Sequence, residues 1–251
     1  AVAGIVPEIL DLKYLFIETN SKVYYNTNLA PSASFVSTKV QHDLTAYAES
    51  SELNKYGARF KYSRFLKVID SSHESVTSNI TTVEMRRDLR LAISEVAEYA
   101  IDFGNEFHIQ SMNGFNIRSS AFRVLNINTD VYLYDIPDLT GEKGQISLFS
   151  LNEGSSTPVI QRRNIGVIDY KKGRITLDPI NIVSGKTKDN VDILEISATP
   201  ESNDIIGLQD LYLQLDNSLV DMVVDEISSG ADPSGSTYTV TTSYKNGRII
   251  R

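Results

Sequence analysis

Short alternating segments separated by turn residues dominate the chain after residue 90, and they constrain its fold more than any other feature. Between residues 98 and 215, β-branched and aromatic residues alternate with polar ones in the segments EYAIDF, FNIRSSAFRV, VYLYDI, QISLFSL, IGVID, RITL, VDILEIS and LYLQL. Gly, Pro, Asn and Asp interrupt these segments at short intervals, as turns between strands require. The pattern predicts a mainly antiparallel β-domain over residues 91–227. The stretch from residue 219 to residue 227 fits a strand or a helical turn.

The first 90 residues combine strand and helix signals. An apolar segment at residues 10–17, a turn at residues 20–21 and a VYY segment predict two strands. Apolar residues at helical spacing predict a helix after Ser34, its candidate N-cap, with Gly57 as the stop signal. A second helix is expected over residues 62–69, and alternation over residues 76–82 predicts another strand. Residues 1–90 are therefore predicted to form a small β-α-α-β domain, which makes the fold class α+β.

The last part of the chain reads as a linker followed by a hairpin. Residues 228–237, SSGADPSGST, have the composition of a flexible linker. The sequence YKNGRI at residues 244–249 repeats YKKGRI at residues 170–175, and its Asn-Gly pair suits a two-residue turn. Both copies are predicted to form β-hairpins, although two copies do not establish a repeat architecture. Residues 228–251 are thus expected to be a linker plus a C-terminal β-hairpin.

Charge is distributed unevenly along the chain. The formal net charge is −8, with 11 Lys and Arg against 10 Asp and Glu in residues 1–90, and 13 against 22 in residues 91–251. No Lys or Arg lies between Lys188 and Lys245. Such an acidic field repels phosphate backbones, so nucleic acid is not expected as a partner. The acidic half is either an ordinary solvated face or a docking surface for a basic partner.

One interface is predicted from this asymmetry. The densest basic cluster comprises Arg86, Arg87 and Arg90. On a strand Arg86 and Arg87 would face opposite sides, whereas on a helix Arg86 and Arg90 would share a face. We expect basic residues of one copy to meet acidic residues of a neighbouring copy, with the candidate interface residues being Arg86, Arg90, Asp210, Asp216, Asp221 and Asp225.

Nothing in the sequence predicts a catalytic, cofactor or metal site, and no enzyme activity is expected. The chain has no Cys and its three His residues are far apart, so ligands for zinc are few. The segment SGKT at residues 184–187 lacks the preceding Gly of a phosphate-binding loop, and the following residues read as a strand. No membrane partner is expected, since no apolar run approaches 18 residues. A small-molecule substrate is not expected either, because no catalytic site is predicted. The chain starts without Met, from which we expect that it is part of a longer protein.

A resemblance adds to this picture. The β-α-α-β start with Tyr56-Gly57 resembles the domain of baseplate J-like proteins in contractile tails, and the segment IGVIDYKKGRITL at residues 165–177 looks like a hairpin common among such phage proteins. The whole chain, through its KNGR ending, is similar to the C-terminal part of the baseplate wedge subunits (gene product six) of T-even type bacteriophages. The resemblance implies a structural subunit of the virion tail baseplate, assembled in the host cytoplasm. It also implies pairing with another copy as a homodimer, contacts with other baseplate proteins, and the joining of neighbouring wedges into a ring.

Two other classes of function remain open at this stage. A carbohydrate- or host-surface-binding module of a phage tail is the main alternative, and it would need clustered exposed aromatic residues. Most of the 13 Tyr residues, however, alternate along predicted strands. An enzyme that cuts cell-wall sugars would need two carboxyl groups flanking the scissile bond, and carboxylates alone are too common to indicate one.

Overall fold

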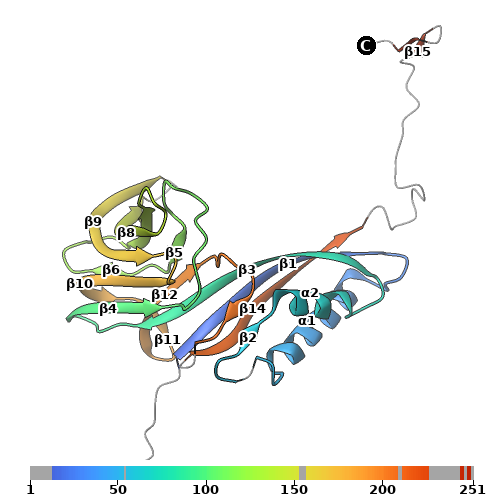
Figure 1. Ribbon diagram of the computed structural model, residues 1–251, viewed down its shortest axis with the longest axis horizontal. Coiled ribbons are helices and arrows are strands. Elements are labelled where there is room, and N and C mark those ends of the chain that lie inside the picture. Colours follow the sequence, from blue (N-terminus) through green and yellow to red (C-terminus); the bar gives the residue numbers. More distant parts are fainter. Residues whose placement is uncertain are drawn as a thin grey trace, which may run out of the picture.

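The computed structural model describes residues 13–53, 55–152, 157–208, 211–225, 244–245 and 248–249. In this part of the chain, strands greatly outnumber helices (Figure 1). The elements follow in the order β1 (Lys13–Tyr25), α1 (Ala33–Ala48), β2 (Arg59–Phe60), α2 (Tyr62–Asp70), β3 (Val76–Arg90), β4 (Val96–Asp102), β5 (Ile117–Ser119), β6 (Arg123–Val124), β7 (Tyr132–Pro137), β8 (Lys143–Leu151), β9 (Pro158–Asp169), β10 (Arg174–Ser184), β11 (Lys186–Lys188), β12 (Val191–Ala198), β13 (Ile205–Ile206), β14 (Leu211–Val224), β15 (Tyr244–Lys245) and β16 (Arg248–Ile249).

The first large sheet joins strands from both ends of the described chain. Its order is β11-β12-β3-β1-β14, and β5 pairs with β12 at the side. β1 and β14 run parallel, while the other neighbours are antiparallel. The register between β1 and β14 shifts after Glu18, where Asn217 is the extra residue of a β-bulge. Because β14 ends the described strand order, it is the edge strand on this side of the sheet.

Helices α1 and α2 pack beside the long strands of this sheet (Figure 1). The predicted apolar stripe of α1 is confirmed, because Val36, Val40, Leu44 and Tyr47 are all buried. The predicted N-cap was wrong. The N-cap is Ser32, whose hydroxyl accepts from the Phe35 backbone N–H at 3.2 Å, rather than Ser34.

The other corrections concern where elements stop. α1 ends at Ala48 with Glu49 as its C-cap, well before Gly57. β1 continues through residues 20–21, where a turn was predicted, because both residues pair with β3. β3 likewise continues past residue 82 to Arg90, with β1 on one side and β12 on the other. Pairing partners distant in the sequence thus extend both strands beyond their local signals.

The second large sheet has the order β4-β10-β9-β8-β7, and β6 pairs with β10. All its described pairs are antiparallel, which confirms the mainly antiparallel character predicted for this part of the chain. The hairpin predicted at residues 170–175 joins β9 to β10. Gly173 has a φ of +62° there, and a Cβ would lie 2.0 Å from the Asn105 carbonyl oxygen, so only glycine fits. β15 and β16 pair antiparallel, as the second hairpin prediction requires.

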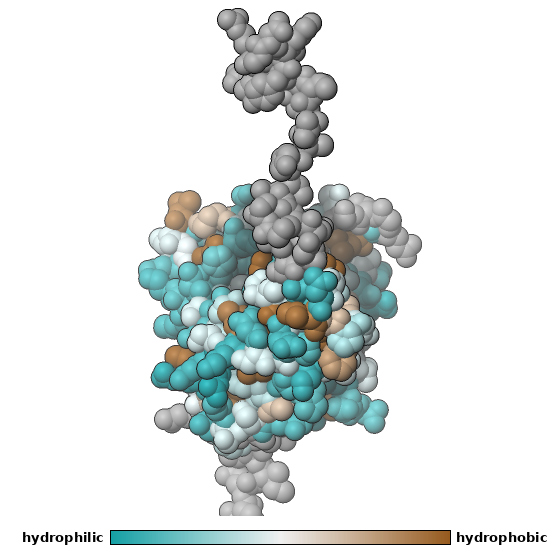
Figure 2. Space-filling model, turned by 90° about the vertical axis from the view of Figure 1, so that its right-hand side faces the viewer, coloured by the Kyte–Doolittle hydropathy of each residue, from teal (hydrophilic) through white to brown (hydrophobic). Residues whose placement is uncertain are grey.

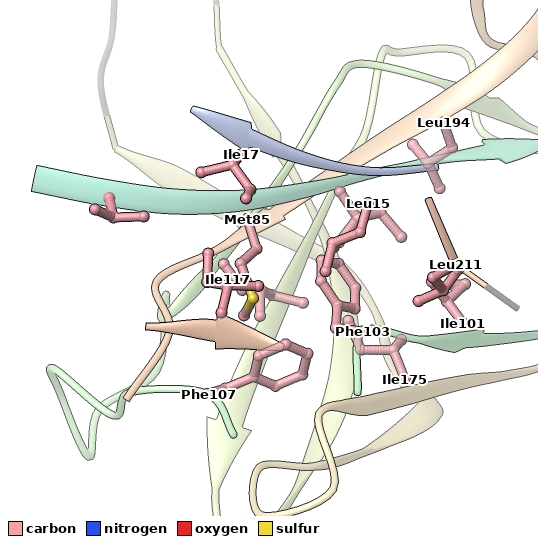
Figure 3. Packing of buried hydrophobic residues seen from close by; sticks show 14 of the residues in the cluster. Leu15, Ile17, Met85, Ile101, Phe103, Phe107, Ile117, Ile175, Leu194 and Leu211 are labelled. Atoms are coloured by element: carbon pink, nitrogen blue, oxygen red, sulfur yellow. The ribbon is translucent and has the colours of Figure 1, made fainter. Parts of the chain in front are cut away.

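One hydrophobic core spans both large sheets. Leu15 and Ile17 of β1 and Met85 of β3 are fully buried, and Figure 3 shows them facing Phe107 and Ile117 from the segment after β4. The division of the chain at residue 90 remains a prediction, and the sheet pairing shows that strands from both sides of that residue share this core. The linker predicted at residues 228–237 lies outside the described residues.

Candidate assembly surface

The edge strand β14 is the longest strand with one unpaired side in the described structure. It runs for 14 residues beside β1, and Figure 1 shows it along the border of the sheet. Within the described residues, its outer side is bonded only at its beginning, where Tyr212 forms an isolated bridge with Tyr56. Backbone N–H and C=O groups on such an edge are ready to pair with another strand.

Aliphatic side chains make this edge apolar as well as unpaired. Leu219 is 56% exposed and Val224 is also exposed, whereas Val220 and Met222 pack against the core. Alternation accounts for Leu219, Val220 and Met222, because successive residues of a strand point to opposite faces, and Val224 is the last residue of the strand. Proteins usually protect edge strands with charged residues, proline or short length. β14 carries one exposed charge in its second half, Asp221.

A groove separates this edge from helix α1. Its volume is about 820 Å³, and its lining comes from α1, β14, Tyr14 of β1 and Tyr56 of the loop after α1. The apolar part of the lining includes Leu213 and Leu215 of β14 and Leu44 of α1, and the polar part includes Gln41 and Glu49 of α1. A groove between a helix and a strand edge can accept an extended chain that bonds to the strand and places side chains toward the helix.

Three tyrosines close one end of the groove. The ring of Tyr212 lies 5.7 Å from that of Tyr14 and 5.8 Å from that of Tyr56, in both cases edge to face. The Tyr56 side chain is otherwise exposed. The trio therefore fixes the end of the groove at the start of β14, and the groove opens along the strand toward Ser218.

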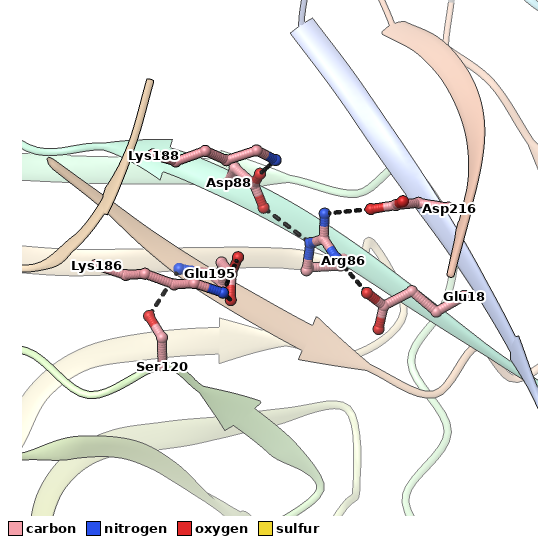
Figure 4. Close-up of polar contacts among 8 residues, drawn as sticks. All are labelled: Glu18, Arg86, Asp88, Ser120, Lys186, Lys188, Glu195 and Asp216. Carbon is pink, nitrogen blue, oxygen red and sulfur yellow. Dashed lines mark hydrogen bonds and ion pairs between the residues drawn. The ribbon is translucent and has the colours of Figure 1, made fainter. Parts of the chain in front are cut away.

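The opposite face of the same sheet carries an ion cluster centred on Arg86 (Figure 4). Arg86 donates from Nε to Asp88 at 2.9 Å and from Nη2 to Asp216 at 2.7 Å, and its Nη1 also contacts Glu18. The residues come from β3, β14 and β1, and the register places Glu18 beside Asp216. A single guanidinium thereby links three neighbouring strands.

Burial and charge act in opposite directions on Arg86. Its side chain is only 10% exposed. Burial lowers the pKa of its guanidinium, but the hydrogen bond to Asp216 and the charges of Asp88 and Glu18 outweigh that effect and raise the pKa overall. The guanidinium carbon also lies 4.5 Å from the centre of the Phe16 ring. Arg86 is therefore a permanently charged structural residue.

Lys188 completes the cluster. Its ammonium lies 2.8 Å from Asp88 and 4.9 Å from the centre of the Phe16 ring. The cluster lines a wide depression of about 1280 Å³, which also includes Arg90 and Ile101. Each carboxylate of the cluster therefore has a cation within the chain.

The structure brings some of the predicted interface residues together and separates others. Arg86 and Asp216 meet within one chain, whereas the prediction had them meeting between copies. Arg90 is exposed at the end of β3, and Asp221 is exposed on β14. Asp225 accepts from the Thr77 hydroxyl at 2.7 Å, and Asp210 lies outside the described residues.

Sequence reasoning missed Glu18, Asp88 and Lys188 as partners of this cluster. The period-two rule could have placed Phe16 with Glu18, and Arg86 with Asp88, on common faces of their strands. It could not have shown that β1 lies between β3 and β14. The contact between Arg86 and Asp216 depends on that order.

The described residues contain no group of three or more His, Cys, Asp or Glu side chains suited to a metal ion. His42 contacts Asp43, His73 contacts Ser75, and His108 contacts Glu201, all in separate places. Lys186 of the SGKT segment pairs with Glu195. No helix in the described part is both long and apolar enough to cross a membrane.

Apolar residues at one end of the molecule are dispersed. Figure 2 shows this end, where brown apolar side chains lie singly or in small groups among hydrophilic ones. Dispersed exposed apolar residues are normal on soluble surfaces and mark no interface by themselves. β14 differs in combining exposed aliphatic side chains with an outer backbone edge that is unpaired in the described structure.

Comparison with known proteins identifies relatives of the first part of the chain. A family model described as the C-terminal domain III of the baseplate structural protein gp6 matches residues 13–88. Residues 13–88 are thus similar to a gp6 C-terminal baseplate domain. The baseplate wedge protein gp6 of Enterobacteria phage T4 is 28% identical over 141 residues, which are 54% of this chain and 21% of that protein. The matched part is thus about a fifth of the T4 protein's length.

The matched gp6 domain comprises β1, α1, β2, α2 and most of β3. It includes Glu18, Arg86 and Asp88, and it supplies the α1 wall of the groove, whereas the strand wall is β14. The resemblance to gp6-type wedge subunits is confirmed. β14 completes the sheet of this domain from beyond the matched residues.

Proposed function

We propose that this chain is a structural part of a phage tail baseplate wedge, which pairs with a second copy and helps to join neighbouring wedges into the baseplate ring. The observation that carries the proposal is the match of residues 13–88 to the gp6 C-terminal domain. The T4 relative is named as a baseplate wedge protein, which supports a place in the virion tail after assembly in the host cytoplasm.

The geometry suggests β14 as the part of the surface that meets another copy. Its outer side is unpaired from residue 213 onward within the described structure, and its side chains are largely aliphatic. Two-fold interfaces use the same patch on both subunits, so an element at a sheet border is well placed for one. The ion cluster of Arg86 stiffens the same three strands from the other face.

The Arg86 cluster also changes how the predicted charged interface is understood. Asp216 is held by Arg86 within the chain, so it contributes to the sheet before any association. Asp221 and Arg90 remain exposed and are retained as interface residues in the proposal. Exposed ion pairs contribute only about 0–1 kcal/mol each, so the apolar edge must supply most of the affinity.

Other baseplate proteins are proposed as the remaining partners. The net charge of −8 and the long stretch without Lys or Arg favour partners with basic surfaces. Nucleic acid, membrane and small-molecule partners form no part of the proposal, and neither does catalysis.

Molar mass by light scattering during size-exclusion chromatography tests the self-association. A dilution series from about 100 to 1 μM, at low and at high salt, should show a dimer that persists at the lower concentrations. Co-purification with neighbouring tail proteins of the same phage tests the second part. A monomer at every concentration that also captures no tail protein would remove the basis for the proposal.

One observation bears on the alternative of carbohydrate binding. The Tyr14, Tyr56 and Tyr212 cluster places aromatic rings at a groove. However, the rings pack edge to face against each other, and Tyr14 stacks on Phe16 at 5.7 Å, so ring faces are used within the chain. Reproducible glycan-array binding that disappears in Tyr56→Ala would favour this alternative.

A further inference from the structure

The groove beside α1 suits one kind of occupant, an extended chain. Its long wall is the unpaired edge of β14, and its other wall is the helix surface around Gln41, Thr45 and Ala48. An extended segment in this position would satisfy the backbone groups of the edge and place every second side chain toward the helix. A helix or a globular loop would leave the strand edge unpaired.

The charges around the groove restrict the occupant further. Glu49 borders it, and Asp221 is exposed farther along the same edge. Acidic side chains on an added strand would therefore be repelled. The occupant should alternate apolar or β-branched residues with neutral ones and should carry basic rather than acidic charge.

The chain itself contains a segment with these properties. Residues 237–243 read TYTVTTS, in which Tyr238, Val240 and Thr242 alternate with two threonines. β-Branched and aromatic residues in strict alternation are the strand signature. No Asp or Glu follows Asp232, whereas Lys245, Arg248 and Arg251 do follow the segment.

The length of the intervening chain allows docking on another molecule. Eleven residues separate Asp225 from Thr237, while hairpin loops that return a strand to its neighbour have about 2–5 residues. Fully extended, this connection reaches about 40 Å. The backbone N–H of Asp225 still bonds to the Tyr25 carbonyl at 2.9 Å, so the chain leaves β14 at the opposite end from the groove.

We propose that residues 237–243 of one copy add as a strand to the free edge of β14 of a second copy, in the groove beside α1. This inference rests on the proposed self-association and specifies its contact. A reciprocal exchange would make two such contacts per dimer, each combining backbone pairing with the attraction between the basic C-terminal residues and the acidic edge.

The absence of cysteine from the full sequence allows a direct test. Ser218 lines the groove, and its replacement in Ser218→Cys is nearly isosteric. Full-length chains with this substitution are mixed with chains carrying a single cysteine at position 239, 240, 241 or 242, and the mixtures are oxidised. Disulfides form only where Cα atoms approach to about 4.4–6.8 Å.

We expect covalent dimers between the two kinds of chain, with yields that alternate from one position to the next because strand side chains alternate in direction. The better positions should exceed the control mixture ~tenfold, since a docked segment has a high effective concentration. The matched control replaces Ser218→Cys by Leu139→Cys, a fully exposed residue between β7 and β8.

Other results would overturn the inference in distinguishable ways. If doubly substituted chains close a disulfide within one molecule and the mixtures give no dimers, the segment occupies its own edge. If yields equal those of the control, the segment does not occupy the groove. Light scattering on the unoxidised samples reports self-association separately, so a dimer without these disulfides contradicts the strand addition alone, and a monomer contradicts the proposed pairing as well.

Discussion

The second large sheet protects its two edges, whereas the first sheet leaves the outer side of β14 unpaired along most of its described length. At one edge of the second sheet, β7 has six residues and ends at Pro137. Its outer backbone is bonded, because Leu133 N–H donates to the Ser119 hydroxyl at 2.9 Å and Phe115 N–H donates to the Asp135 carbonyl at 3.2 Å. These are common means of preventing unwanted strand pairing.

The opposite edge of the second sheet is also short. β4 has seven residues, and exposed Glu98 lies on it. β14 has twice that length and carries mostly aliphatic residues in its second half. One chain can thus protect some of its sheet edges and expose another. Association is expected at the exposed edge.

The sheets also differ in how their polar interiors are arranged. The second sheet contains Asp135, which is fully buried and accepts from Asn116 N–H, Asn116 Nδ2, Ile117 N–H and the Tyr170 hydroxyl at 2.6–2.9 Å. The first sheet instead has the partly exposed ion cluster of Arg86. A closed polar centre fixes one sheet, and an ion cluster that solvent still reaches fixes the other.

The largest effect is expected at Asp135. Asp135→Ala removes the acceptor of four hydrogen bonds and leaves buried donors without partners, so the free energy of unfolding should fall by about 3–5 kcal/mol. Urea denaturation followed by circular dichroism measures this loss. Asp138→Ala, at an exposed turn, is the control and should cost much less. Equal losses in both variants would show that the hydrogen bonds of buried Asp135 contribute no more to the free energy of unfolding than those of an exposed turn.

A somewhat smaller effect is expected at Arg86. Arg86→Met removes the cation shared by Glu18, Asp88 and Asp216, and breaking such a partly buried group should cost about 3 kcal/mol. Arg86→Lys keeps the charge but loses the planar fork and should cost about half as much. The same denaturation experiment ranks the two. A Met variant as stable as the parent would indicate that the cluster contributes no net stability.

Tyr170 gives a pH-dependent prediction. Burial, followed by the nearby charge of Asp135, raises the pKa of the Tyr170 phenol in the folded chain. The unfolded chain then releases this proton first, at about pH 10, so the free energy of unfolding declines as pH rises above that value. Tyr170→Phe should lose about 1 kcal/mol at neutral pH from the missing hydrogen bond. Above pH 10 its stability should fall less steeply than that of the parent, and parallel curves would contradict this assignment.

The smallest effect is expected from Asp221, the exposed charge on β14. Asp221→Lys should leave the stability of the single chain nearly unchanged and weaken association by about 0–1 kcal/mol, which is at most a few-fold in the dissociation constant. High salt should reduce the difference between variant and parent. Asp216→Lys is a poor test of the same idea, because Asp216 is bound to Arg86 within the chain. An unchanged dissociation constant at low salt would remove Asp221 from the proposed interface.

Local patterns predicted the elements better than they predicted how the elements meet. The helical stripe from Val36 to Tyr47 and the hairpin at residues 170–175 depend on nearby residues and were correctly predicted. The parallel pairing of β1 with β14 joins residues almost 200 positions apart, and no local periodicity encodes it. The short strand β2 between the two helices also escaped prediction, because its partner β13 is likewise far away in the sequence.

The candidate surface shows the same limit. Charge composition predicted a contact between copies that involves Arg86 and Asp216, and that contact remains a prediction. The sequence could not show that β1 brings Arg86 and Asp216 together within one chain. The edge itself had been identified only as the segment LYLQL with an undecided continuation, which the structure resolves as strand through Val224.

The central claim is that β14 is the edge through which two copies associate, and a pair of matched variants tests it most directly. Leu219 is 56% exposed on β14, and Val96 is 69% exposed on β4, the edge strand of the other sheet. Light scattering over a dilution series should show that Leu219→Lys raises the dimer dissociation constant at least about tenfold, equivalent to about 1.4 kcal/mol, while Val96→Lys leaves it unchanged. The opposite ranking, or equal dimers in both variants, would contradict the claim.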